Sequence, residues 1–252
     1  MKSSWFGFAW ILIVALGSAG CRSVLAPPAD CPGDPVEVVM ELRADWQRAP
    51  YVGRYEGTDC GGCESDVKSK EFIRRETENL LFRYPRHVPT RYFAALLAYE
   101  ADDPIRAIEH LDTLFAIQPV HPEATILRAR IALEDGNVPY AQKLLREQVA
   151  LRPNDPALHE ALSSAHFMDD QLDDALSSLD AADRLGGPQW RIEYNRGVIE
   201  EARGNSQMAA GHYKTSLSLM PHWGPPRNRL EALEKGQVSD SQVVGFPPAR
   251  IR

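Results

Sequence analysis

The sequence predicts an all-α fold, a solenoid in which helix-turn-helix repeats stack on one another. From Val88 to Trp223 it repeats every 34 residues, four times, without insertion or deletion, and periods of this length indicate stacked helical repeats. When each repeat is numbered from 1 at Val88, positions 8 and 20 hold only small residues: Ala95, Ala129, Ser163 and Gly197, then Ala107, Ala141, Ala175 and Ala209. Since two helices approach closely only where side chains are small, these positions predict the helix crossing within each repeat.

The remaining columns predict how each repeat turns, stacks and ends. Larger residues at position 24 are expected in the stacking layer, turn residues at position 15 should separate the two helices, and Pro or Gly at position 32 should end the second helix. These columns read Leu111, Leu145, Leu179 and Tyr213 at position 24, Asp102, Gly136, Asp170 and Gly204 at position 15, and Pro119, Pro153, Gly187 and Pro221 at position 32.

Residues 36–87 are predicted to be a degenerate repeat that precedes the four regular ones. Helical apolar spacing runs through 36–49 and again through 70–84, and Pro85 falls at position 32 of the same frame. Between the two helices lies a glycine-rich loop, 51–66, which contains a C-G-G-C sequence. The predicted organisation continues with the four repeats over 88–223, a polar capping helix over 224–236 and a flexible tail over 237–252.

The first 35 residues read as a targeting segment and a spacer. Lys2 precedes an apolar run from Trp5 to Leu16, which is too short to span a bilayer, and the run leads into Ser18-Ala19-Gly20-Cys21. These four residues resemble the lipobox of bacterial lipoproteins. The resemblance implies that residues 1–20 are a signal peptide, that Cys21 is the palmitate-bearing first residue of the mature chain, and that 21–35 is a proline-rich spacer. The residue after the cysteine is Arg22 and not Asp, and resemblance to the lipoprotein sorting pattern then implies the outer membrane, facing the periplasm. An ordinary cleaved secretory signal is the alternative.

The repeat columns resemble the tetratricopeptide repeat (TPR) family, most clearly at Arg196-Gly197, Ala209, Tyr213 and Pro221. The tryptophan that the family usually carries near position 4 is absent from all four repeats. The resemblance implies a right-handed solenoid whose first helices line a concave peptide groove. Carried over to this sequence, the groove residues are Tyr92, Leu96, Tyr99, Ile126, Arg130, Leu133, Glu160, Ser164, Phe167, Tyr194 and Val198.

This lining is mostly apolar and aromatic, and it lacks the paired Lys and Asn of the carboxylate-clamp members of the family. It predicts a site for an amphipathic helix or an extended apolar segment, anchored by the aromatic residues. The alternative is that the chain's own N-terminal helices or tail cover the groove, because exposed apolar patches are usually covered or used.

The cysteines leave two hypotheses open. Besides Cys21 the chain has Cys31, Cys60 and Cys63, and in an oxidising periplasm a structural disulfide is expected, either Cys60 with Cys63 or one of them with Cys31. The alternative is a periplasmic thiol-disulfide or metal-handling factor that uses the C-G-G-C sequence. Haem attachment would require His where Glu64 stands, and zinc would require further ligands.

Composition and motifs exclude several other classes. The net charge is −7, which argues against nucleic-acid binding. The sequence contains no nucleophile, nucleotide or metal motif, so we expect neither an enzyme nor a cofactor, metal or small-molecule substrate.

The chain as a whole is similar to the TPR lipoproteins of Gram-negative bacteria, which include the pilotins of type IV pilus secretins. The resemblance implies a membrane-anchored scaffold for envelope-complex assembly, with a secretin subunit as a possible partner.

Overall fold

The computed structural model describes residues 34–48 and 69–235 of the chain. Apart from Asp34, these residues belong to one compact unit, Pro35–Arg252. The predicted signal peptide, the predicted lipidation site Cys21 and the predicted spacer up to residue 33 lie outside the described residues. So do Cys31, the predicted loop with Cys60 and Cys63, and the predicted tail.

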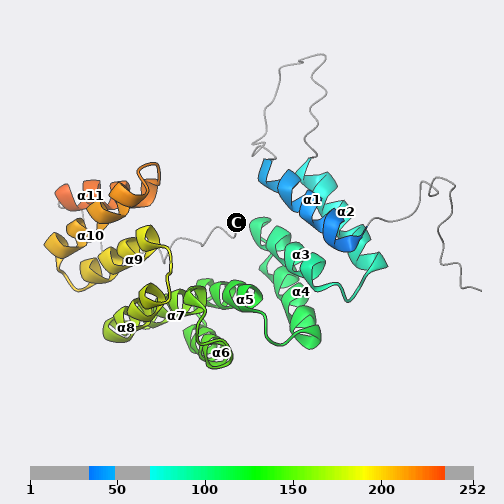
Figure 1. Cartoon of the computed structure of the whole chain (residues 1–252), viewed down its shortest axis with the longest axis horizontal. Coiled ribbons are helices and arrows are strands. Elements are labelled where there is room, and N and C mark those ends of the chain that lie inside the picture. Colours follow the sequence, from blue (N-terminus) through cyan, green and yellow to red (C-terminus); the bar gives the residue numbers. More distant parts are fainter. Residues whose placement is uncertain (1–33, 49–68, 236–252) are drawn as a thin grey trace, which may run out of the picture. The chain divides into compact units, whose positions relative to one another are not determined.

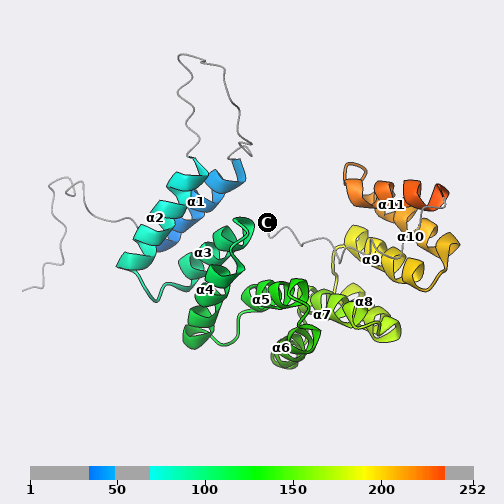
Figure 2. The ribbon, with the colours of Figure 1, turned by 180° about the vertical axis from the view of Figure 1, so that it is seen from behind.

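The described residues form eleven α-helices and no strand, which confirms the predicted all-α fold (Figure 1). From α2 to α11 the helices follow one another along the chain and are joined by short turns (Figure 2). Their bounds are α1 Pro35–Arg48, α2 Lys70–Arg83, α3 Val88–Glu100, α4 Pro104–Ile117, α5 Pro122–Glu134, α6 Val138–Leu151, α7 Pro156–Met168, α8 Leu172–Arg184, α9 Gln189–Ala202, α10 Ser206–Leu219 and α11 Gly224–Glu234.

Each 34-residue repeat is one helix pair: α3 with α4, α5 with α6, α7 with α8, and α9 with α10. The small columns lie at the crossings, as predicted. All four alanines at position 20 are 0 % exposed, and at position 8 Ala95, Ala129 and Ser163 are at most 1 % exposed. The Ser163 hydroxyl donates to the carbonyl of Ala175 across the third crossing, at 2.7 Å, so this polar side chain is buried with its hydrogen bond made.

Position 15 is the turn between the two helices of every repeat, and all four residues there adopt the left-handed backbone conformation. Their φ values are 59° at Asp102, 76° at Gly136, 57° at Asp170 and 81° at Gly204. Glycine adopts positive φ without a steric penalty, and aspartate is one of the few other residues that tolerate it. The alternation of Asp and Gly at this position therefore follows from one backbone requirement.

The core is shared between consecutive repeats rather than enclosed within each. One buried cluster joins α3 and α4 to α5 through Leu111, Leu114 and Leu127, and the next joins α5 and α6 to α7 through Leu145 and Leu158. A third extends from α7 and α8 to α9 and α10. No single repeat buries its own apolar face, as expected for a solenoid.

Helices α1 and α2 pack on the first regular repeat. Leu42, Trp46 and Ile73 form a buried cluster with Phe93 and Leu97 of α3. The indole Nε1 of Trp46 donates to Glu100 Oε2 at 2.7 Å. The packing of α1 and α2 thus covers the face of α3 on which a preceding repeat would pack in a longer solenoid. None of the described helices combines the length and apolar character needed to cross a bilayer.

Candidate interaction surface

The structure divides the predicted groove residues into two groups. Six are half-buried and keep part of their surface in contact with solvent: Leu96, Tyr99, Ile126, Arg130, Leu133 and Ser164. Five are buried, with exposed fractions of 2–8 %: Tyr92, Glu160, Phe167, Tyr194 and Val198. The half-buried apolar members lie on α3 and α5, so the accessible part of the predicted lining is concentrated in the first two repeats.

The expectation that Tyr92, Phe167 and Tyr194 are free anchors needs correction, because all three are core residues. Tyr92 belongs to the cluster that joins the first two repeats, and Phe167 and Tyr194 belong to the cluster around α9. The Tyr194 ring lies 4.8 Å from that of Trp223, measured between centroids. In a solenoid the first helix of a repeat also contacts the first helix of the next, and a large ring at such a position fills the space between them.

Glu160 was predicted to carry a charge in the groove, but in the structure it is buried and paired with other side chains. It forms an ion pair with Arg191 and accepts a hydrogen bond from Asn195 Nδ2 at 3.3 Å. Burial raises the pKa of Glu160, and the contact with Arg191 opposes that rise. This cluster connects α7 to α9 and is not available as a free charge for a ligand.

Tyr99 is the aromatic groove residue that stays half-exposed. Its hydroxyl donates to Glu134 Oε1 at 2.5 Å, which connects α3 to the end of α5. The guanidinium of Arg130 lies 6.0 Å from the centre of its ring. Burial and the hydrogen bond to Glu134 raise the pKa of Tyr99 to about 12. Tyr99, Arg130 and Leu133 thus form one surface across the first two repeats, which we call the α3–α5 face together with Leu96 and Ile126.

A second concave site, which the sequence did not indicate, lies beside this face. It is a cleft of about 480 Å³ between α4 and the α5–α6 pair, and we call it the α4–α5 cleft. Its lining residues are Tyr99, Asp102, Pro104, Ile105, Ile108, Arg128, Ile131, Ala132, Glu134, Asp135, Asn137 and Tyr140. One feature of the sequence could have indicated this cleft. Position 18 of the first repeat holds the large aliphatic residue Ile105, whereas the other repeats have Pro139, Asp173 and Gln207 there.

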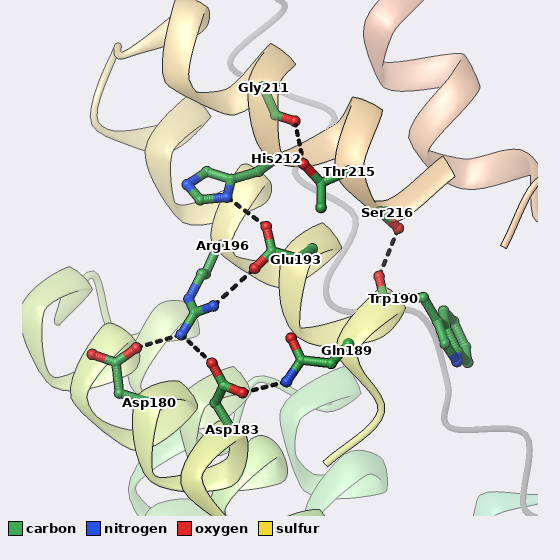
Figure 3. A network of polar contacts seen from close by, with 10 residues as sticks. All are labelled: Asp180, Asp183, Gln189, Trp190, Glu193, Arg196, Gly211, His212, Thr215 and Ser216. Atoms are coloured by element: carbon green, nitrogen blue, oxygen red, sulfur yellow. Dashed lines mark hydrogen bonds and ion pairs between the residues drawn. The ribbon is translucent and has the colours of Figure 1, made fainter. Parts of the chain in front are cut away.

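Repeats three and four are joined by a polar network centred on Arg196 (Figure 3). Its guanidinium contacts Asp180 and Asp183 of α8 at 2.7 and 2.8 Å and Glu193 of α9 at 2.8 Å. The other Glu193 oxygen lies 2.9 Å from His212 Nδ1 on α10. Arg196 is 20 % exposed and already engaged by three carboxylates, so this network connects helices and leaves little capacity for a ligand.

Four tyrosines, each buried wholly or in part, make the fold sensitive to high pH. Burial raises the pKa values of Tyr92, Tyr99, Tyr194 and Tyr213 above the ordinary value of 10.0. The unfolded chain therefore releases these protons at lower pH than the folded chain. The contribution of these tyrosines to stability is complete below about pH 10 and is lost as the pH rises toward 12 and above. Thermal melts followed by circular dichroism should show a melting temperature that falls over the same pH range in which phenolate absorbance rises. A constant melting temperature while phenolate forms would contradict this.

The architecture defines a class of fold, the α-helical repeat solenoids. Within that class, residues 98–165 match the family model described as tetratricopeptide repeat. The fold and this match together support the TPR repeat family, the resemblance that the residue columns predict.

Solved structures share the fold at low sequence identity. A thermophilic TPR protein of Thermus thermophilus matches with a TM-score of 0.62 and 16 % identity, over 80 % of this chain and 97 % of that one. A TPR protein of Parabacteroides merdae matches with 0.58 and 19 %, over 66 % and 64 %. MamA of Desulfovibrio magneticus matches with 0.54 and 17 %, over 82 % and 99 %. A comparison with curated proteins found no match.

The described residues contain no group of His, Cys, Asp or Glu side chains that could hold a metal ion.

Proposed function

We propose that this chain is a membrane-tethered TPR scaffold that binds a partner protein on the α3–α5 face. The observation that carries the proposal is the apolar surface left there. Leu96, Tyr99, Ile126 and Leu133 pack on the core from outside and remain half-exposed, whereas Phe167, Tyr194 and Val198 of the later repeats are buried. Exposed apolar patches on folded proteins commonly mark interaction sites.

The residue types on this face suit a protein partner. Tyrosine and arginine are enriched at the energetic centres of protein interfaces, where one side chain supplies both apolar area and hydrogen bonding. Tyr99 and Arg130 lie beside each other here, bordered by leucine and isoleucine. An amphipathic helix or an extended apolar segment of the partner would bury this surface.

The tether and the cellular role rest on the leader sequence. The short apolar run before Ser18-Ala19-Gly20-Cys21 supports lipidation at Cys21 and attachment to the outer membrane, facing the periplasm. A scaffold in this place would work in the assembly of an envelope complex such as a type IV pilus or secretion apparatus, with a secretin subunit as candidate partner. The similarity to TPR lipoproteins supports this choice.

A double variant tests the binding face. Leu96→Ser with Ile126→Ser should reduce capture of the partner from solubilised envelope by more than tenfold, because truncating interface hot spots commonly costs about 2 kcal/mol or more each. Leu151→Ser is the control, since Leu151 is 58 % exposed at the end of α6 and does not belong to this face. Undiminished capture by a double variant that folds normally would reject the proposed face.

The same preparation tests the tether. Cys21→Ser should move the protein from the membrane pellet to the soluble periplasmic fraction, because stable anchoring depends on acyl chains. Retention in membranes after a carbonate wash would reject lipidation as the anchor.

A further inference from the structure

The α4–α5 cleft has apolar side chains that are open to solvent. Ile105 is 72 % exposed and Tyr140 is 37 % exposed, and Ile108 and Ile131 line the cleft beside them. Two exposed large apolar side chains at the mouth of one cleft are unfavourable in water unless something covers them.

The cleft is open because this junction has aliphatic residues where the later junctions of the solenoid have polar bridges. Between the second and third repeats, Gln142 at position 21 donates to Asp169 at 3.1 Å and to the carbonyl of Ala165 at 3.3 Å. Between the third and fourth, Asp173 at position 18 forms an ion pair with Arg203 at position 14. Each bridge connects the second helix of one repeat to the end of the first helix of the next.

At the first junction, Ile108 occupies position 21 and Ile105 occupies position 18. An aliphatic side chain can form neither bridge. Position 14 of the second repeat is Asp135, where the fourth repeat has Arg203. The residues that close the other junctions are thus replaced here by two isoleucines that share the cleft with a carboxylate.

The lining of the cleft is negatively charged. Asp102, Glu134 and Asp135 contribute three carboxylates, and among the described lining residues the one cation is Arg128. Arg128 is already engaged, because its Nε lies 3.5 Å from Asp112 Oδ1 and its guanidinium lies 4.9 Å from the centre of the Tyr140 ring. A ligand of this cleft would therefore meet apolar side chains and carboxylates together.

We propose that the α4–α5 cleft binds a segment of a partner protein in which an aliphatic or aromatic side chain is flanked by arginine or lysine. The apolar side chain packs against Ile105, Ile108 and Tyr140, and the flanking cation pairs with Asp102 or Asp135. Arginine suits this place because its guanidinium binds a carboxylate through two hydrogen bonds while its flat face packs on apolar surface. This inference rests on the proposed scaffold function and specifies the chemistry of the partner.

The test measures binding of a fluorescein-labelled peptide, Ser-Gly-Arg-Ile-Arg-Gly-Ser, to the full chain by fluorescence anisotropy. Saturable binding that weakens with added salt is expected. Peptides with Glu in place of both Arg, or with Ser in place of Ile, should bind at least tenfold more weakly. Equal binding of the three peptides, or no binding of the first, would overturn the proposal.

A variant pair places the binding in the cleft. Ile105→Asp with Asp135→Arg recreates the bridge of the last junction and should reduce peptide affinity by more than tenfold. Ile105→Asp alone should also weaken binding through loss of apolar contact, and it should fold because Ile105 is exposed. Met208→Asp is the matched control, an exposed apolar residue of α10 that is 52 % exposed and should leave binding unchanged. Unchanged affinity in both cleft variants would overturn the proposal.

Two further measurements separate this inference from its alternatives. The double variant at Leu96 and Ile126 should bind the peptide normally even where it loses the envelope partner, so failure of the α3–α5 face and failure of the cleft can be told apart. Loss of peptide binding in this variant would overturn the cleft as the site. Deletion of residues 237–252 should leave peptide affinity unchanged; a rise of more than tenfold would assign the cleft to the chain's own tail instead of a partner.

Discussion

Phe167→Ala is expected to destabilise the protein by about 3–5 kcal/mol, the usual cost of removing a buried aromatic ring. The ring is 7 % exposed and belongs to the cluster that joins α7 and α8 to α9 and α10. Its removal leaves a cavity at the junction of two repeats, where the surrounding helices cannot fully collapse. Chemical denaturation followed by circular dichroism measures the change.

Phe82→Ala is the control for the same chemical change. Phe82 is 90 % exposed on α2, so its replacement should shift the free energy of unfolding by no more than about 0.5 kcal/mol. Equal effects of the two substitutions would mean that Phe167 is accessible, as the sequence-based expectation of a free groove anchor implies.

Gly197→Ala is expected to cost about 1–3 kcal/mol or more, because there is no room for a methyl group at this crossing. A Cβ atom built on Gly197 would lie 2.5 Å from Cε1 and 2.7 Å from Cδ1 of Tyr213. Tyr213 is 0 % exposed, and its hydroxyl donates to Glu201 Oε2 at 2.6 Å. The ring is held at both ends and cannot move aside without breaking that hydrogen bond.

Gly211→Ala, on the same pair of helices, is expected to change the stability in the opposite direction. Apart from its chain neighbours and the nearby backbone of its own helix, no atom lies within 4 Å of a Cβ atom built on Gly211. Alanine there should therefore stabilise α10 by about 0.5–1 kcal/mol through its higher helix propensity. Denaturant midpoints of the two variants should therefore move in opposite directions. A loss of stability in both, or in neither, would contradict the steric account.

Tyr213→Leu should rescue Gly197→Ala. The first two repeats pair alanine at position 8 with leucine at position 24, as in Ala95 with Leu111, and both residues of that pair are fully buried. The double substitution converts the fourth crossing to that pair, so its cost should be smaller than the sum of the single costs. Additive costs would show that the two residues do not share the space.

The sequence determined the repeat architecture because several columns of the 34-residue frame meet a requirement that lies within one repeat. Position 20 must be small where helices cross, and position 15 must tolerate positive φ. Ala141 and Gly136 satisfy these requirements on their own, so the crossings and turns could be predicted without knowing which residues meet across the fold. The small residues at position 8 and the larger ones at position 24 could be predicted in the same way. Only the structure showed how closely Tyr213 packs on Gly197.

The tertiary structure alone decided which side chains remain accessible. Tyr99 and Phe167 share position 12 of the frame, yet Tyr99 is half-buried and Phe167 is core. Likewise, Ile105 and Asp135 both line the α4–α5 cleft, whereas Asp173 and Arg203, at the same positions two repeats later, form an ion pair. Periodicity describes a residue within its own repeat, but accessibility depends on what the neighbouring repeat places against it, and that is fixed only when the helices pack.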